Sequence, residues 1–234
     1  MGQLCGTGSF FHPGPPAAVG KADAEIMDFL IARVEGETLD LGGGRGAYAH
    51  ALREQGHQVT LAEKNLGCLE DVQKLGIPVV DMNTASWSDL KGRFDTIILI
   101  EVLEHVENPM EFLGNVIACA RRKVLLTVPC NDDFEKLFKC GLTYNHIAVT
   151  DHLHQFKSEE ISLLFRALKS RMHLHRGAYL FPRNFISIMN ESLAGNKVAR
   201  LALFPLRLFN KIGWLPRLFP SRIFVEAYPP VSSG

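Results

Sequence analysis

Apolar residues along the chain follow two spacings that predict alternating helices and strands. Between residues 22 and 34 they recur at helical spacing. Short apolar runs follow at 38–43, 57–64, 77–81, 94–101 and 123–129, and helical patterns separate them at 46–56, 66–75 and 109–120. Residues 94–101, FDTIILIE, show no polar alternation, as expected of a strand that is buried on both faces. This order predicts crossover connections and a mostly parallel α/β sheet.

The pattern changes after Pro129. The remaining chain predicts a short helix at 131–139, a helix at 158–169 with Ser158 as its N-cap, and strands at 171–178 and 222–228. Residues 1–20 are rich in Gly and Pro and predict a flexible lead-in. We expect residues 21–234 to form a single domain, in which residues 184–220 are a helical, basic and apolar insertion.

Composition narrows the class of protein. The chain has 25 Lys and Arg against 25 Asp and Glu and is 47% hydrophobic, which is ordinary for a globular domain and excludes disorder, collagen and coiled coil. A zero net charge does not favour nucleic acid as a partner. The five cysteines form no C-x-x-C pair, and the sequence shows neither a signal-peptide pattern nor an apolar run of membrane-spanning length. These features predict a soluble, cytoplasmic protein.

A glycine-rich turn links the first predicted strand to the helix after it. In LDLGGGRG, residues 39–46, glycines let the backbone approach a ligand, and the helix N-terminus offers unpaired N–H groups. Gly42, Gly44 and Ala47 also satisfy the looser dinucleotide fingerprint, and Glu63 could hold a ribose in either case. The turn alone therefore leaves a nicotinamide cofactor, another nucleoside cofactor and a ligand-free turn open.

Further motifs extend this pattern in order through about residues 36–165. They are LDLGGGRG, AEKN with Glu63, VVDMN with Asp81, and IILIEVLEHVENP after the fourth strand. This series resembles the class I S-adenosylmethionine-dependent methyltransferases, including the small-molecule members similar to ubiquinone-biosynthesis O-methyltransferases. The resemblance implies a doubly wound, mostly parallel seven-stranded Rossmann-like sheet whose last strand is reversed. It also implies S-adenosylmethionine as cofactor, bound by Asp40, Gly42, Gly43, Gly44, Glu63, Asp81, Met82 and Glu101.

Acidic residues and histidines gather where the fourth and fifth strands end. His105, His146 and His152 are candidate general bases, because the unperturbed pKa of imidazole lies near neutrality. Some relatives with Glu-x-x-Glu-His and a downstream His use a metal. By that resemblance Glu101, Glu104, His105 and His152 are candidate ligands for Mg²⁺ or Mn²⁺. A purely structural role for this cluster, and for His154, stays open.

Residues 195–225 combine six Lys and Arg with many large apolar residues and no acidic residue. This segment fits a lid, a peripheral membrane contact or plain packing. Without it the chain has 19 basic and 25 acidic residues, so the remaining body is mildly acidic. By the resemblance named above, we expect methylation, at oxygen, of a small-molecule or lipid-like acceptor. The alternatives are a non-catalytic binding or membrane-docking module, a metal-dependent RNA 2′-O-methyltransferase and an NAD oxidoreductase.

Overall fold

A computed structural model describes residues 21–139, 142–144, 147, 149–179, 185–187 and 219–230. The described helices are α1 (Ala24–Ile31), α2 (Ala47–Glu54), α3 (Leu66–Lys74), α4 (Trp87–Leu90), the 3₁₀ turn η1 (Leu103–His105), α5 (Pro109–Cys119), α6 (Phe134–Lys139) and α7 (Ser158–Ala167). The strands are β1 (Thr38–Leu41), β2 (Val59–Glu63), β3 (Val79–Asp81), β4 (Phe94–Ile100), β5 (Ala120–Pro129), β6 (Leu142–Tyr144), β7 (Arg171–Tyr179), β8 (Phe185–Ser187) and β9 (Phe219–Tyr228).

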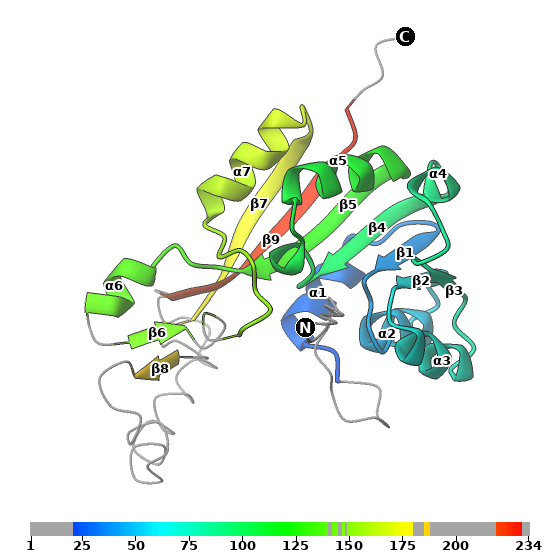
Figure 1. The fold of residues 1–234 in the computed structure, drawn as a ribbon, viewed down its shortest axis with the longest axis horizontal. Helices are drawn as coiled ribbons and strands as arrows, with labels where there is room; N and C mark the ends of the chain where they lie inside the picture. Colours follow the sequence, from blue (N-terminus) through cyan, green and yellow to red (C-terminus); the bar gives the residue numbers. More distant parts are fainter. Residues whose placement is uncertain are drawn as a thin grey trace, which may run out of the picture.

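Seven strands form one twisted sheet in the order β3-β2-β1-β4-β5-β9-β7 (Figure 1). Neighbouring strands from β3 to β5 are parallel, whereas β9 runs antiparallel to both β5 and β7. The predicted seven-stranded, mostly parallel sheet with a reversed last strand is confirmed.

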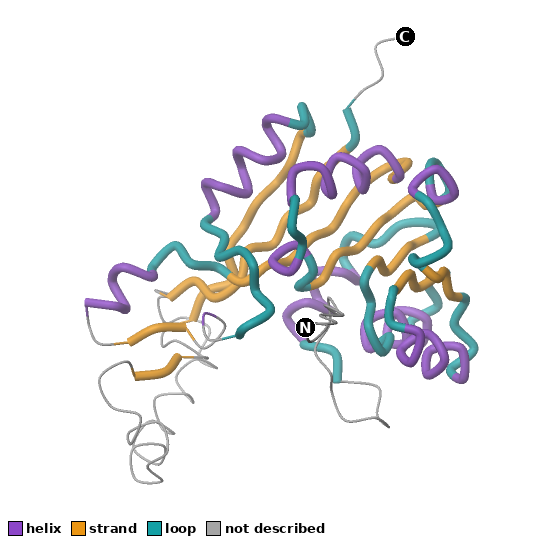
Figure 2. The backbone as a smooth tube through the Cα atoms, viewed as in Figure 1, coloured by secondary structure: helices purple, strands orange, loops and turns teal. Residues whose placement is uncertain are grey.

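Helices cover both faces of this sheet, as a doubly wound fold requires (Figure 2). On one face, apolar residues of α1, α2 and α3 pack against the central strands; Leu30, Leu52 and Val72 are fully buried there. On the other face, α4, α5 and α7 do the same through residues such as Leu90, Val116 and Phe165. A central strand between two such cores must be apolar on both sides, and β4 is buried at six of its seven positions.

Helix α7 begins one residue earlier than the predicted N-cap implies. Its N-cap is Lys157, and Ser158 is the first helical residue, so the prediction of Ser158 as N-cap is wrong. The reason is a longer-range contact, because the backbone N–H and hydroxyl of Ser158 both donate to the carboxylate of Asp132. Arg176 of β7 donates to the same carboxylate, so Asp132 ties α7 to β7.

Beyond the main sheet, β6 and β8 form an antiparallel pair next to α6 (Figure 1). Residues 185–187 are therefore a strand within the region predicted to be helical, because they pair with β6. The rest of that predicted insertion up to residue 218, and the predicted lead-in at 1–20, lie outside the described residues. Among the described helices, none is both long and apolar enough to cross a membrane.

Candidate active site

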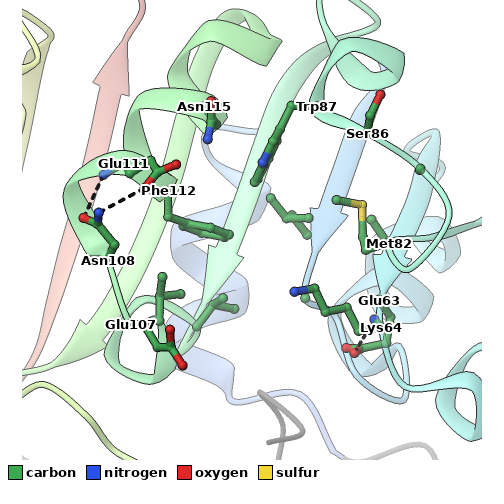
Figure 3. Close-up of a pocket in the computed structure, with 16 residues that line it drawn as sticks. Glu63, Lys64, Met82, Ser86, Trp87, Glu107, Asn108, Glu111, Phe112 and Asn115 are labelled. Carbon is green, nitrogen blue, oxygen red and sulfur yellow. Dashed lines mark hydrogen bonds between the residues drawn. The ribbon is translucent and has the colours of Figure 1, made fainter. Parts of the chain in front are cut away.

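A cavity of about 550 Å³ opens at the carboxyl ends of β1, β2 and β4 (Figure 3). Open α/β sheets bind their ligands at this edge. The cavity is lined by Leu41, Gly42, Ala62, Glu63, Lys64, Met82, Ala85, Ser86, Trp87, Val102, Val106, Glu107, Asn108, Glu111, Phe112 and Asn115. It thus brings together the glycine loop, the end of β2 and the segments after β3 and β4, which the sequence had proposed as a cofactor site.

Glu63 binds the glycine loop in this structure. Its Oε2 accepts from the N–H of Gly44 at 3.1 Å, and its Oε1 accepts from the N–H groups of Lys64 at 2.6 Å and Asn65 at 2.9 Å. Burial raises the pKa of this carboxyl, although these three N–H donors act against the rise. Oε2 accepts only one of these bonds and keeps a second lone pair, so the carboxylate can hold the loop and still accept from a ribose hydroxyl.

Asp40 lies beneath the same loop and is 1% exposed. Its Oδ2 is buried without a hydrogen-bond partner, and a Cβ at Gly43 would lie only 2.5 Å from it. Burial raises the pKa of Asp40 to about 7, and the Glu63 carboxylate contributes to the rise. Asp40 is not among the residues that line the cavity, so its position fits bracing of the loop better than contact with a cofactor ammonium.

The predicted adenine contacts after β3 occupy different positions. Met82 lines the cavity, whereas Asp81 does not. Oδ1 of Asp81 accepts from the backbone N–H and the side-chain amide of Asn83, both at 2.8 Å. This carboxylate therefore caps the turn that follows β3.

Glu101 follows β4 with a φ of 55°, in the left-handed region that residues other than glycine rarely adopt. Its Oε1 accepts from the hydroxyl of Thr127 and from Nε of Arg222, each at 3.0 Å. Arg222 also lies 3.7 Å from the Asp23 carboxylate. Burial alone would lower the pKa of Arg222, but Glu101 and Asp23 outweigh burial and raise it. The last strand thus fixes the side chain of Glu101 through a charge pair.

The side chains of Glu104, His105 and His152 lie close together, with Glu104 near the Glu101 carboxylate. One potential ligand atom from each lies within 4.8 Å of the other two. Both carboxylate oxygens of Glu104 are buried without a hydrogen-bond partner. Burial raises the pKa of Glu104 well above its ordinary value, and the neighbouring Glu101 carboxylate adds to the rise.

Backbone bonds hold this cluster together. The carbonyl of Glu104 accepts from the N–H groups of Leu153 and His154, at 2.8 and 3.1 Å, so the loop after β5 is fastened onto η1. Nδ1 of His105 lies 3.0 Å from the carbonyl oxygen of Asp151. Because a carbonyl only accepts, Nδ1 is the donor in this contact.

The structure therefore brings together three of the four predicted metal ligands, while Glu101 is paired with Arg222 instead. His146 lies outside the described residues, and the side-chain Nε2 of His154 is buried without a hydrogen-bond partner. The sequence analysis did not predict that the site includes Trp87, Phe112, Asn115, Asp151 or Arg222. The mixture of apolar and polar residues at the start of α5 could have indicated a cavity wall. Arg222 could not have been found from a local pattern, because 121 residues separate it from Glu101.

Comparison with known families shows which family the chain belongs to. A family model described as a methyltransferase domain matches residues 19–193, which is most of the chain. The chain belongs to this methyltransferase family. The methyltransferase is an S-adenosylmethionine-dependent enzyme of class I, as the resemblance predicted, and the alternative of an NAD oxidoreductase is thereby set aside.

Relatives of known name agree with this membership. The methyltransferase is 32% identical over 103 residues to the ubiquinone biosynthesis O-methyltransferase of Dechloromonas aromatica (strain RCB), a match that covers 41% of this chain and 43% of that relative. The match thus spans less than half of the relative.

Solved structures share the fold. A SAM-dependent methyltransferase from Archaeoglobus fulgidus has a TM-score of 0.58 at 14% identity, with 87% of this chain and 93% of that chain covered. The magnesium protoporphyrin IX methyltransferase of Synechocystis PCC 6803, solved with bound SAH, has a TM-score of 0.54 at 15% identity, with 87% and 80% covered.

Proposed function

We propose that this methyltransferase transfers the methyl group of S-adenosylmethionine to a hydroxyl oxygen of a small-molecule acceptor. The observation that carries the proposal is the cluster of Glu104, His105 and His152 at the edge of the sheet where the cofactor cavity opens. The name of the O-methyltransferase relative supports oxygen as the accepting atom.

The reaction needs little covalent help from the protein. The acceptor oxygen attacks the methyl carbon, the carbon–sulfur bond breaks, and the products are a methyl ether and S-adenosylhomocysteine. The hydroxyl proton must leave, and we assign its acceptance to the imidazole of His105, whose Nδ1 lies 3.0 Å from the Asp151 carbonyl oxygen. Nδ1–H stays on the carbonyl of Asp151 and holds the ring in this tautomer. Most of the rate comes from holding the oxygen in line with the methyl group.

As the alternative to His105 acting as the base, we propose that the same cluster binds a divalent cation, in which case Nε2 of His105 is a ligand and does not accept the proton. A carboxylate that is 1% exposed and lacks a hydrogen bond needs a proton or a cation to offset the cost of its burial. The bond from His105 to the Asp151 carbonyl is the outer contact that metal-binding imidazoles commonly make. When bound, the cation would lower the pKa of an acceptor hydroxyl that coordinates it.

The donor set favours some ions over others. With Glu101 held by Arg222, one carboxylate and two imidazoles remain. Magnesium prefers oxygen ligands, so this set suits manganese or zinc better. The proposal therefore keeps manganese from the earlier expectation, gives up magnesium and adds zinc, because manganese and zinc accept nitrogen ligands more readily.

Chelation and metal binding test this part. After EDTA treatment, we expect Mn²⁺ or Zn²⁺ to bind the protein in calorimetry, and Glu104→Gln to weaken that binding at least tenfold by removing a ligand. Equal binding by both proteins, or no binding to either, contradicts the metal proposal. Methyl transfer that is unchanged after chelation supports His105 acting without a metal.

Oxygen methylation is tested with cofactor carrying a labelled methyl group. In a cell extract incubated with the protein, we expect the label in methyl ethers, identified by mass spectrometry of the products. His105→Ala should lower turnover by about 100-fold or more, since a positioned acid or base contributes on that order. His57→Ala, two residues before the amino end of β2 and so at the opposite end of that strand from the site, is the matched control. Label on nitrogen or carbon would contradict the proposal.

The finer predictions about the acceptor rest on other parts of the chain. A lipid-like acceptor and a peripheral membrane contact were inferred from residues 195–225, of which 195–218 lie outside the described residues. The acidic body argues against RNA as the acceptor. A non-catalytic binding module is distinguished by the same labelling experiment, because it would bind S-adenosylmethionine without turnover.

A further inference from the structure

Glu101 is held by the two strands that lie beyond β4 in the main sheet. β5 lies next to β4, and β9 lies next to β5 (Figure 1). The backbone N–H of Glu101 donates to the carbonyl of Thr127 at 3.0 Å, while Oε1 accepts from the Thr127 hydroxyl and from Nε of Arg222. A φ of 55° costs free energy in a residue other than glycine. These contacts offset that cost and fix the direction of the side chain.

This position keeps the Glu101 carboxylate out of the neighbouring cluster. Among the described residues, the group whose potential ligand atoms all lie within 4.8 Å of one another consists of Glu104, His105 and His152. Glu101 is not part of that group, although its charge raises the pKa of Glu104. Arg222 acts against this rise in pKa, so its positive charge also reaches Glu104. The guanidinium therefore both occupies a nearby carboxylate and repels a cation in the cluster.

Arg222 is itself anchored at a second point. Its Nη1 lies 3.7 Å from the carboxylate of Asp23, the N-cap of α1, and its side chain is 20% exposed. A guanidinium remains charged throughout the pH range in which proteins work, and its planar shape fits carboxylates in a fixed geometry. Arg222 thus competes with any cation for Glu101 at every such pH.

We propose that Arg222 is a positioning residue that sets which divalent cation the cluster accepts, by keeping Glu101 out of its coordination. This inference rests on the metal alternative of the proposed function. One carboxylate and two imidazoles favour ions that accept nitrogen, such as Mn²⁺ and Zn²⁺. A second carboxylate would add the oxygen ligand and the negative charge that Mg²⁺ requires. The chain carries that carboxylate, and Arg222 withholds it.

The experiment measures the binding of MgCl₂, MnCl₂ and ZnCl₂ to EDTA-treated protein by calorimetry. The natural protein should bind Mn²⁺ and Zn²⁺ about tenfold or more tightly than Mg²⁺. In Arg222→Met, Glu101 is released and the nearby positive charge is gone, so the affinity for Mg²⁺ should rise about tenfold or more. The preference for Mn²⁺ over Mg²⁺ should also shrink, because the added ligand is an oxygen. Arg222→Lys keeps the charge and should keep the natural preference.

A paired variant tests the role of Glu101 without leaving its carboxylate unpaired. Glu101→Gln/Arg222→Met removes both charges at once, which avoids the main cost of the single substitution to stability. Its affinity for Mn²⁺ and Zn²⁺ should stay close to that of the natural protein, and the gain in Mg²⁺ affinity should be absent. Thermal unfolding gives a second readout, because a bound ion stabilises the folded state. Of these proteins, only Arg222→Met should be markedly stabilised by MgCl₂.

Two results would overturn this inference and leave the metal proposal standing. The first is an unchanged Mg²⁺ affinity in Arg222→Met. The second is a loss of Mn²⁺ and Zn²⁺ affinity of about tenfold or more in the paired variant, which would make Glu101 a ligand. In both cases Glu104→Gln still weakens Mn²⁺ and Zn²⁺ binding. If neither Mn²⁺ nor Zn²⁺ binds the natural protein, the metal proposal itself is refuted, and this inference with it.

Discussion

Replacing Asp40 by asparagine tests the buried charge beneath the glycine loop. Burial raises the pKa of this carboxyl from its ordinary 3.8 to about 7, with Glu63 as the charged neighbour. An acid whose pKa rises on folding binds its proton more tightly in the folded chain. Its stabilising effect is therefore present below the unfolded pKa and is lost as the pH rises toward the folded pKa.

The expected size follows from the two pKa values. A rise from 3.8 to about 7 corresponds to about 4 kcal/mol, because a tenfold change in equilibrium is worth about 1.36 kcal/mol. Asparagine has a similar shape and no charge. The free energy of unfolding of Asp40→Asn, minus that of the natural protein, should thus increase by up to about 4 kcal/mol between pH 4 and pH 7 and then level off.

Urea unfolding of both proteins across this pH range measures the difference. Groups common to both proteins contribute equally and cancel. Asp132→Asn is the matched control with the opposite sign: burial acts to raise the pKa of Asp132, but its bonds from Ser158 and Arg176 outweigh burial and lower the pKa. The difference for that variant should therefore become less favourable as the pH rises toward the ordinary pKa of 3.8 and should change little between pH 4 and pH 7. An Asp40→Asn difference that does not change with pH would refute the reasoning.

Three further substitutions have expected outcomes in urea unfolding. Arg222→Leu should lower the free energy of unfolding by about 3 kcal/mol, because the partly buried carboxylates of Glu101 and Asp23 lose their cation. Arg222→Lys keeps the charge and should recover part of that loss. Lys123→Met should cost about 2 kcal/mol, since its ammonium bonds two carboxylates at 2.7 and 2.9 Å; no loss would show that these pairs do not stabilise the fold. Gly43→Ala should cost about 1–3 kcal/mol and weaken S-adenosylhomocysteine binding, because its methyl group would meet Asp40 and Leu61 within 2.6 Å; unchanged binding would contradict the close approach.

The spacing of apolar residues and glycines along the chain was enough to predict the central strands of the sheet and the glycine loop. The unalternated run at β4 and the glycines after β1 carry their information in adjacent residues, so the central strands and the loop were found. Two of the short elements, α4 and β8, were not found, whereas the three-residue strand β3 was. Helix α4 has four residues and β8 has three, which is too short for either period to be visible.

The details of the site depend on contacts between distant residues. Asp81 was expected to reach a ligand, which stays a prediction; its Oδ1 also accepts from the nearby Asn83, a contact that the motif alone does not show. Glu101 was grouped with Glu104 because they are close in sequence. Its actual partner is on the last strand, and no periodicity connects the two.

The position of β9 between β5 and β7 has a consequence for synthesis of the chain. Every earlier strand of the main sheet leaves the ribosome before β9, yet β7 cannot join that sheet until β9 has been inserted next to β5. Arg222 arrives with the same strand, and with it the charge partner of Glu101. A nascent chain that lacks residues 219–228 therefore exposes one edge of β5 and has an incomplete site, so capture of the methyl donor should be among the last events of folding.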